Sequence, residues 1–353
     1  MATLSDVAQL AGVSISAVSR VLSNAPETRV SAATRERIEA SARTLEYRPN
    51  FAGRALKSSR SYAVALVVPD LTNAVFTELM GGVEEAALDR NYMVLLGRAE
   101  DMQPGGEMIA KLTGEGRVDG VLIQLGDTIV ADEVQRLLEL RAPVVFINSL
   151  EPTNVGAVTL QDELGAQMAT RHLIELGHRR IGLVGGVPGA YTAGRRAAGF
   201  RAALLEAGLP VEPHYETSLG FTPPSGREAL QTLMATTPPP TALFVANVNA
   251  AIGVLAEART LGVRIPEDLS VVAMHDAWTA ENTWPPLTTV RMPLRELGKT
   301  AMRQLITRLE GVEDRRDVVV SDPAPVLVVR ESTTSPHRQP DAAPAPSPTP
   351  GDS

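Results

Sequence analysis

The 353-residue sequence contains no cysteine. This absence excludes a disulfide-bonded scaffold, a thiolate zinc site, an iron–sulfur cluster and a cysteine nucleophile, and it fits a reducing cytosol. No run of about 18 uninterrupted apolar residues occurs, so no membrane-spanning helix is expected. The start, Met1–Asp6, lacks the basic and apolar regions of a secretory signal. We therefore expect a cytoplasmic protein.

Recognisable catalytic motifs are also lacking. There is no Gly-x-x-x-x-Gly-Lys loop and no Gly-x-Ser-x-Gly elbow, and the 5 histidines show no metal-ligand spacing. The segment Gly185–Gly189 resembles a phosphate loop only weakly, and a tight strand–helix turn explains it better. We expect neither catalysis nor a cofactor nor a bound metal. Aromatic residues make up only 4% of the chain, and those to consider around a ligand are Phe76, Phe221, Trp278 and Trp284.

The net charge of −8 is unevenly distributed. Residues 1–60 contain nine basic and five acidic side chains, a net charge of +4, which leaves −12 for the rest of the chain. A small basic head on a large acidic body predicts nucleic-acid binding at one end only. The competing interpretation is a solvent-exposed helical surface with no role in nucleic-acid binding, which could carry the same charge.

The sequence predicts a helix-turn-helix unit within the first sixty residues. Thr3 is placed to cap a first helix with Asp6 in its first turn, and Gly12 supplies the turn that follows. A second helix follows over Ile15–Leu22, and a third over about Ala32–Leu45 braces the pair. The two later helices are capped by Ser14 and Ser31.

The second helix has two chemically different faces. An apolar set at i, i+3 and i+4 spacing faces inward: Val18, Val21 and Leu22. The opposite face has side chains whose size suits base edges and phosphates: Ile15, Ser16, Ser19 and Arg20. A three-helix bundle without a DNA role would share this pattern.

Four segments resemble the DNA-binding head and hinge of the lactose-repressor (LacI/GalR) family of transcriptional regulators. They are 3–14 (TLSDVAQLAGVS), 18–22 (VSRVL), 30–35 (VSAATR) and 47–50 (YRPN). The similarity continues to about Ser332. One departure is the loop Ser23–Arg29, which is longer than in the namesake of the family.

The resemblance implies which residues contact DNA. Ile15 and Ser16 occupy the base-reading positions, and a hinge helix at about 51–58 would pair with that of a second subunit in the minor groove. Leu56 matches the leucine that is wedged into the central base step. The implied DNA contacts are Thr3, Ser14, Ile15, Ser16, Ser19, Arg20, Asn24, Ser31, Thr34, Tyr47, Asn50, Ala52, Ala55 and Leu56. We expect a pseudo-palindromic duplex operator.

Beyond residue 60, apolar strands alternate with helices, which indicates parallel sheets covered on both faces. Strands are expected at 62–69, 92–97, 118–124 and 143–148, and again at 181–186, 241–246 and 269–274. Helices are expected near 75–90, 163–177, 193–208, 225–235 and 249–262. We predict an all-α head on an α/β body of two lobes, and the resemblance implies the type I periplasmic-binding-protein-like fold with crossovers near 160, 291 and 323.

The predicted domains follow from these patterns. The helix-turn-helix head is assigned to 1–48, the hinge helix to 49–60, the effector-binding and dimerisation domain to 61–334, and a disordered Pro-rich tail to 335–353. Within the body, the first lobe takes 61–160 and 292–322, and the second takes 161–290 and 324–332. Six prolines in the tail exclude a heptad helix for tetramers, so a homodimer is expected.

Ligands of open α/β sheets bind at the carboxyl ends of strands, so residues that follow strands are the effector candidates. The resemblance implies that Arg196, in GRRAAGF (194–200), holds a ligand hydroxyl or carboxylate with its rigid fork of donors. The candidates are Asn73, Val75, Phe76, Gln124, Asn148, Arg196, Phe221, Asn247, His275 and Asp276, with Asp70 beside them. Simple caps (Asp70, Asn148) and core packing (Phe76, Phe221) are competing interpretations.

Three departures from the family remove carboxylates from the predicted cleft. Asn148, Val248 and His275 stand where the family often has Asp. We therefore expect one of two effector classes: a neutral sugar, or a phosphorylated or carboxylated sugar held by Arg196 and His275. The alternatives for function are a solute-binding protein without a DNA role, and an activator in place of a repressor.

Overall fold

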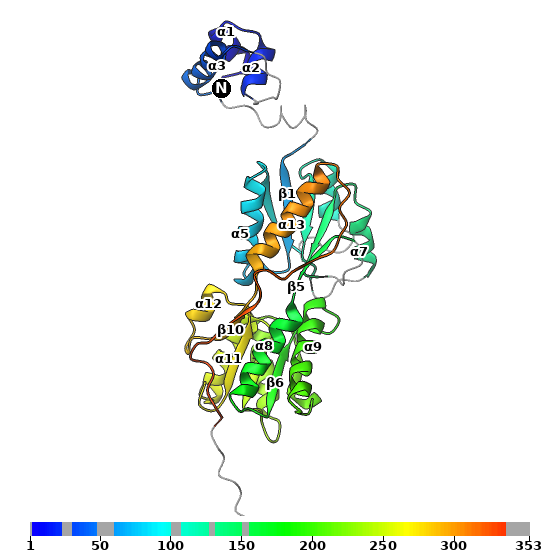
Figure 1. The fold of residues 1–353 in the computed structure, drawn as a ribbon, viewed down its shortest axis with the longest axis vertical. Coiled ribbons are helices and arrows are strands. Elements are labelled where there is room, and N and C mark those ends of the chain that lie inside the picture. The colour runs from blue at the N-terminus through cyan, green and yellow to red at the C-terminus, as the bar shows by residue number, and fades with distance from the viewer. Residues whose placement is uncertain are drawn as a thin grey trace, which may run out of the picture. The chain divides into compact units, whose positions relative to one another are not determined.

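A computed structural model of the protein describes residues 2–22, 30–47, 60–99, 107–126, 131–149 and 155–336. The chain forms two compact units, Met1–Tyr62 and Ala63–Ser353, and each is described by itself (Figure 1). Several predicted features lie outside the described residues: the hinge helix, the loop Ser23–Arg29, the tail from 337 onward, and the candidates Asn24, Asn50, Ala52, Ala55 and Leu56.

The first unit contains the three predicted helices, α1 (Leu4–Ala11), α2 (Ile15–Leu22) and α3 (Ala32–Thr44). Thr3 and Asp6 form a reciprocal capping box, and Gly12 takes the left-handed conformation at φ +65°. Ser31 caps α3 by accepting from the Thr34 amide. The apolar faces meet in one small core that includes Val7, Val18, Val21 and Ile38. The predicted helix-turn-helix unit is confirmed.

The second unit contains two six-stranded sheets, one in each lobe (Figure 1). The first-lobe sheet is wholly parallel, in the order β11-β5-β4-β3-β1-β2. Its strands are β1 (Ala63–Val68), β2 (Met93–Arg98), β3 (Gly120–Ile123), β4 (Val144–Ile147), β5 (Ala157–Leu160) and β11 (Val318–Val320).

The second-lobe sheet has the order β12-β10-β9-β8-β6-β7 and is parallel except for the β10–β12 pair. Its strands are β6 (Ile181–Gly185), β7 (Glu216–Ser218), β8 (Ala242–Val245), β9 (Ser270–Met274), β10 (Thr288–Arg291) and β12 (Val326–Val328). The chain passes between the two sheets three times: after β5, after β10 and between β11 and β12.

Closely packed helix pairs cover the sheets. Added Cβ atoms at Gly82, Gly199 and Gly226 would lie 2.0, 2.2 and 2.0 Å from backbone oxygens of the facing helices. The pairs are α5 (Val75–Leu88) with α13 (Leu294–Leu309), α8 (Asp162–Glu175) with α9 (Tyr191–Glu206), and α10 (Pro223–Met234) with α11 (Val248–Leu261). The remaining helices are α6 (Glu107–Gly114), α7 (Ala131–Leu138), the 3-10 turn Pro213–Tyr215 and α12 (Trp278–Glu281).

The predicted strands are all present, but one has a different environment. A sheet covered on both faces was expected, whereas the side chains of β2 are exposed or half-buried. The reason is that β2 stands at the edge of its sheet, next to β1. None of the helices in the described part of the chain is long and apolar enough to cross a bilayer.

Candidate functional site

The first candidate surface is the outer face of α2. Ile15 is 52% exposed, whereas Val18 and Val21 on the opposite face are buried. The hydroxyl of Ser14 accepts from the Ala17 amide at 3.3 Å, which stabilises the beginning of the helix. An exposed apolar side chain beside a small hydroxyl residue, Ser16, leaves this face open to a partner.

Most of the other candidate side chains of the head make contacts within the head itself. Arg20 donates through Nε to the Ser16 carbonyl at 3.3 Å. The Thr3 hydroxyl and amide both donate to the Asp6 carboxylate at 2.8 Å, and these bonds lower the Asp6 pKa. Tyr47 packs against the head core. Thr34 bonds the hydroxyl of Ser31 at 2.8 Å, and Ser19 is half-buried on α2.

In the body, Arg196 is the centre of a buried polar cluster. It lies on α9, is 3% exposed, and all three guanidinium nitrogens have protein partners. Its Nε donates to Oδ1 of Asp162 at 2.7 Å, Nη1 donates to the Ala246 carbonyl at 2.7 Å, and Nη2 lies 2.8 Å from Nε2 of His275. The cation therefore joins α8, the end of β8 and the end of β9.

Asn148 extends this cluster to the first lobe. It follows β4, has a φ of +43°, and is 3% exposed. Its Nδ2 donates to Oδ2 of Asp162 at 2.9 Å, and its Oδ1 accepts from the Leu160 amide at 3.0 Å. Asn148, Asp162, Arg196 and His275 therefore form a polar chain in which each side chain contacts the next. Asn148 belongs to the first lobe and His275 to the second. Such a connection can respond to a change in the angle between the lobes.

Asp162 was not among the predicted site residues. It is fully buried at the beginning of α8 and provides the carboxylate that pairs with Arg196. A signal was available in the sequence, because the polar residues Gln161 and Asp162 follow the apolar strand ending at Leu160 and precede an amphipathic helix. That strand, β5, was not predicted, so the residue after it was not considered.

Other candidates are positioned by local bonds. Asn247 caps α11 by accepting from the Asn249 amide at 2.8 Å, and Asn73 accepts from the Val75 amide at 3.2 Å near the beginning of α5. Asp70 accepts from the amide and hydroxyl of Thr72. Val75 and Phe76 are each 5% exposed in the first turn of α5, and Gln124 is partly buried after β3.

Phe221 lies against the Arg196 cluster. The guanidinium carbon of Arg196 is 5.4 Å from the centroid of its ring, a distance typical of a cation–π contact. The ring also contacts Gly186 after β6, where an added Cβ would lie 2.3 Å from the ring. Half-buried in this position, Phe221 offers an aromatic surface next to the polar cluster.

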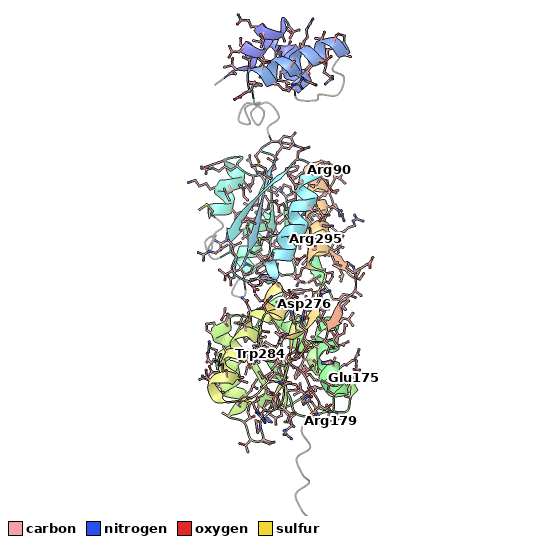
Figure 2. All side chains as sticks on the ribbon, turned by 90° about the vertical axis from the view of Figure 1, so that its left-hand side faces the viewer. Arg90, Glu175, Arg179, Asp276, Trp284 and Arg295 are labelled. Carbon is pink, nitrogen blue, oxygen red and sulfur yellow. The ribbon has the colours of Figure 1, made fainter. Side chains whose placement is uncertain are left out.

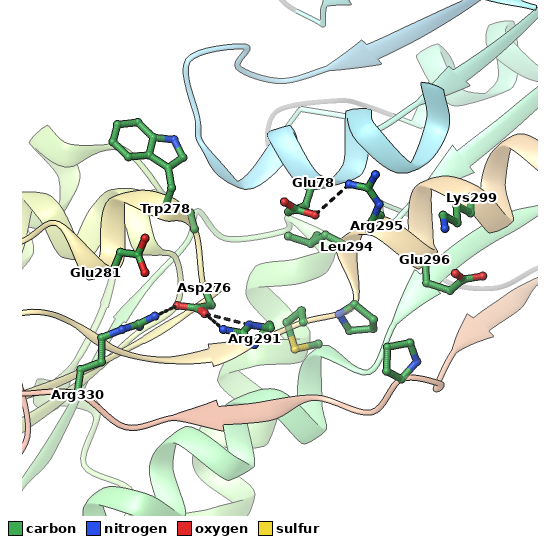
Figure 3. Close-up of a pocket in the computed structure, with 14 residues that line it drawn as sticks. Glu78, Asp276, Trp278, Glu281, Arg291, Leu294, Arg295, Glu296, Lys299 and Arg330 are labelled. Atoms are coloured by element: carbon green, nitrogen blue, oxygen red, sulfur yellow. Dashed lines mark hydrogen bonds and ion pairs between the residues drawn. The ribbon is translucent and has the colours of Figure 1, made fainter. Parts of the chain in front are cut away.

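Asp276 lies in a different environment from its neighbour His275. Its carboxylate accepts from Thr289 at 2.8 Å and from Arg291 and Arg330 at 2.6 and 2.7 Å. Burial opposes the ionised form, but these hydrogen bonds dominate and lower the Asp276 pKa. Figure 3 shows the carboxylate between the two arginines.

This carboxylate lines a pocket of about 540 Å³ that the Arg196 cluster does not line. Figure 3 shows Glu78 and Arg295 on the first-lobe side of the pocket, and Trp278 and Glu281 on the other. Of the predicted effector residues, Asp276 lines this pocket, whereas Asn148, Arg196 and His275 belong to the polar cluster. Trp284, the other tryptophan, is 90% exposed on the second lobe (Figure 2).

Comparison with known proteins gives two family matches. Residues 3–50 match the model for bacterial regulatory proteins of the lacI family, and residues 170–333 match the periplasmic binding protein-like domain. The chain is 34% identical over 314 residues to the HTH-type transcriptional repressor CytR of Escherichia coli strain K12, covering 88% of this chain and 90% of CytR.

Two solved structures extend the likeness to three dimensions. The transcriptional regulator CelR in its complex with cellobiose is 30% identical, with a TM-score of 0.70, and the match covers 94% of this chain and all of CelR. The lac repressor dimer bound to operator and the anti-inducer ONPF is 26% identical, with a TM-score of 0.79, and covers 94% of this chain and 99% of that one.

Proposed function

Because the chain belongs to the lacI family of bacterial regulatory proteins, and is a DNA-binding transcriptional regulator under the control of a small molecule, we propose that it is a cytoplasmic repressor. It binds a pseudo-palindromic operator as a homodimer. A sugar or sugar derivative, bound between the lobes, sets its affinity for that operator. We propose that the protein has no catalytic activity.

One observation carries the proposal of effector control. The polar chain Asn148–Asp162–Arg196–His275 begins at the end of a first-lobe strand and ends after a second-lobe strand. Asn148, Asp162 and His275 follow parallel strands, and the ends of such strands are where open α/β sheets bind ligands. A ligand that contacts these four residues at one angle between the lobes, but not at another, shifts the equilibrium between the two conformations.

Control of operator affinity then follows from linkage. If the effector and the operator favour different lobe angles, each lowers affinity for the other by the same factor. The change reaches DNA through the hinge that follows residue 48, whose proposed pairing in the minor groove depends on the distance between the two subunits. Phe221 and Asn247, next to Arg196 and Ala246, are the further residues that we propose to contact the effector.

An exposed apolar surface on the first lobe supports the homodimer. Leu88, Met93 and Leu96 are 66, 60 and 53% exposed, and Leu95 beside them is 41% exposed. Three of them lie on the edge strand β2, and Leu88 ends the adjoining helix α5. Exposed apolar side chains gathered along one sheet edge are typical of interfaces between proteins. A second copy of the chain is the partner that we propose for this surface.

Operator selection tests the function. Full-length protein is incubated with a library of random duplexes, and the enriched sequence is then titrated by fluorescence anisotropy with and without candidate sugars. We expect an enriched sequence with two-fold symmetry, and a sugar that changes its affinity. Absence of any enriched duplex would favour a solute-binding protein, and transcription assays that show stimulation would favour an activator.

A further inference from the structure

The imidazole of His275 is occupied on one side only. His275 follows β9 with a φ of +72° and is 2% exposed. Its Nε2 lies 2.8 Å from Nη2 of Arg196. Its Nδ1 is also buried, and among the described residues it has no hydrogen-bond partner. Buried polar atoms almost always have a partner in a folded protein, so this nitrogen is available to a ligand.

The arginine determines which nitrogen of His275 carries the proton. A guanidinium has five donors and no acceptor, so Nε2 must accept, and the proton of a neutral imidazole is then on Nδ1. Burial, together with the charge of Arg196, lowers the pKa of His275 well below 6.5. The ring therefore stays neutral, and Nδ1–H is a hydrogen-bond donor.

The cation that contacts His275 already has a counter-charge. Asp162 lies 2.7 Å from Arg196, and both side chains are almost completely buried. An anionic group of a ligand would therefore meet one neutral donor and a cation whose charge is compensated, and burying an anion without a counter-charge is costly.

From these contacts we propose that His275 determines effector specificity as a hydrogen-bond donor. Its Nδ1–H donates to an uncharged oxygen of the effector, such as a carbonyl, ether or hydroxyl oxygen, and the site selects against a carboxylate or phosphate at that position. This inference rests on the proposed function, because it requires an effector between the lobes. It narrows the effector class to neutral, oxygen-rich molecules.

An isosteric pair of variants separates donation from packing. In H275N the amide nitrogen donates near the place of Nδ1, whereas in H275L a side chain of nearly the same shape neither donates nor accepts. Full-length proteins are titrated calorimetrically with the neutral sugars ribose, glucose and cellobiose, and with the anionic ribose 5-phosphate, glucose 6-phosphate and gluconate. We expect the wild type to bind a neutral probe, H275N to bind it within about threefold, and H275L to bind it at least tenfold more weakly.

Two results of this titration would overturn the inference. One is tighter binding of the anionic member of a pair. The other is equal affinity of H275N and H275L for the neutral probe, because His275 would then only support Arg196 or bind a water molecule.

A second measurement needs no ligand. The ¹⁵N chemical shifts of the histidine ring nitrogens distinguish the two neutral tautomers, and H275N identifies the signals of His275 by their loss. We expect the Nδ1-protonated tautomer at pH 7, and either the Nε2-protonated or the doubly protonated ring overturns the inference even if no probe binds. Failure of the wild type to bind any operator would instead refute the proposed function, without changing this spectrum.

Discussion

The carboxylate of Asp162 and the guanidinium of Arg196 form a buried ion pair at 2.7 Å, at the junction between the two lobes. The oxygen of Asp162 that does not face Arg196 accepts from Asn148. The charge of Arg196 is therefore balanced within the protein, whereas the sequence had allowed an anionic effector as its partner. Arg196 contacts Asp162, Ala246 and His275 at once.

Removing the charge of Asp162 would destabilise the body. In D162N the Arg196 cation stays buried without a counter-charge, which costs about 3–5 kcal/mol of unfolding free energy. Urea unfolding followed by circular dichroism measures the loss. The control is E206Q, which breaks the exposed pair Arg171–Glu206 and costs no more than about 1 kcal/mol. Equal losses in the two variants would contradict a special role for the buried pair.

A methyl group at Gly199 would force α8 and α9 apart. Its Cβ would lie 2.2 Å from the Glu163 carbonyl oxygen, and overpacking of this kind costs about 1–3 kcal/mol. We expect G199A to unfold at lower urea concentration and to weaken effector binding, because α8 carries Asp162 and α9 carries Arg196. In the control G194A, on the same helix with nothing within 4 Å, alanine stabilises the helix by up to about 1 kcal/mol.

Among the groups that make the stability depend on pH are two histidines that hold the end of the second lobe. His178 bonds Thr241, Ser270 and the Thr334 carbonyl, and Nε2 of His172 lies 3.0 Å from the Thr333 hydroxyl. Burial lowers the pKa of both histidines below 6.5. The unfolded chain therefore binds protons more readily, and the unfolding free energy decreases as the pH falls below 6.5.

Urea unfolding at pH 7.5 and 5.5 tests this dependence. We expect the wild type to lose stability at the lower pH, and H178Q to lose less over the same interval because one of the titrating groups is gone. H214Q, which changes a half-exposed histidine of the second lobe, is the control for the replacement of a histidine by glutamine. An unchanged slope in H178Q would argue against titration of His178.

A charge on the edge strand β2 would disrupt the proposed homodimer. L96E places a carboxylate on the edge strand that also carries the exposed Met93 and Leu95, and we expect a monomer of about 37.5 kDa by light scattering. L205E is the matched control, since Leu205 is 65% exposed on α9. If L96E keeps the mass of a dimer, the subunits associate through another surface.

Leu56 provides a test of the DNA-binding mode expected from the sequence. A leucine wedge unstacks one base step and bends the operator, so that more of the protein contacts it. We expect L56A to weaken binding to the selected operator at least tenfold, to leave non-specific DNA binding unchanged, and to keep effector affinity within about twofold. Anisotropy and calorimetry measure the two affinities, and unchanged operator affinity would refute the wedge.

The sequence by itself determined the helix-turn-helix head and the two-lobed α/β body, and it identified Arg196 as a candidate. Each depends on a local or periodic signal: caps such as Thr3 and Ser31, a glycine turn at Gly12, and runs of apolar strand residues. These signals act over a few residues, because backbone hydrogen bonding and burial of one face are local requirements.

Only the tertiary structure decided the partners of those residues. Asp162 and Arg196 are 34 positions apart, and His275 is 79 beyond Arg196, so their contact depends on how the strands are ordered in the sheet. The same is true of His275 and Asp276, which are adjacent in sequence but lie among different partners. Which nitrogen of His275 holds a proton follows from its contact with Arg196, and no pattern in the sequence contains that contact.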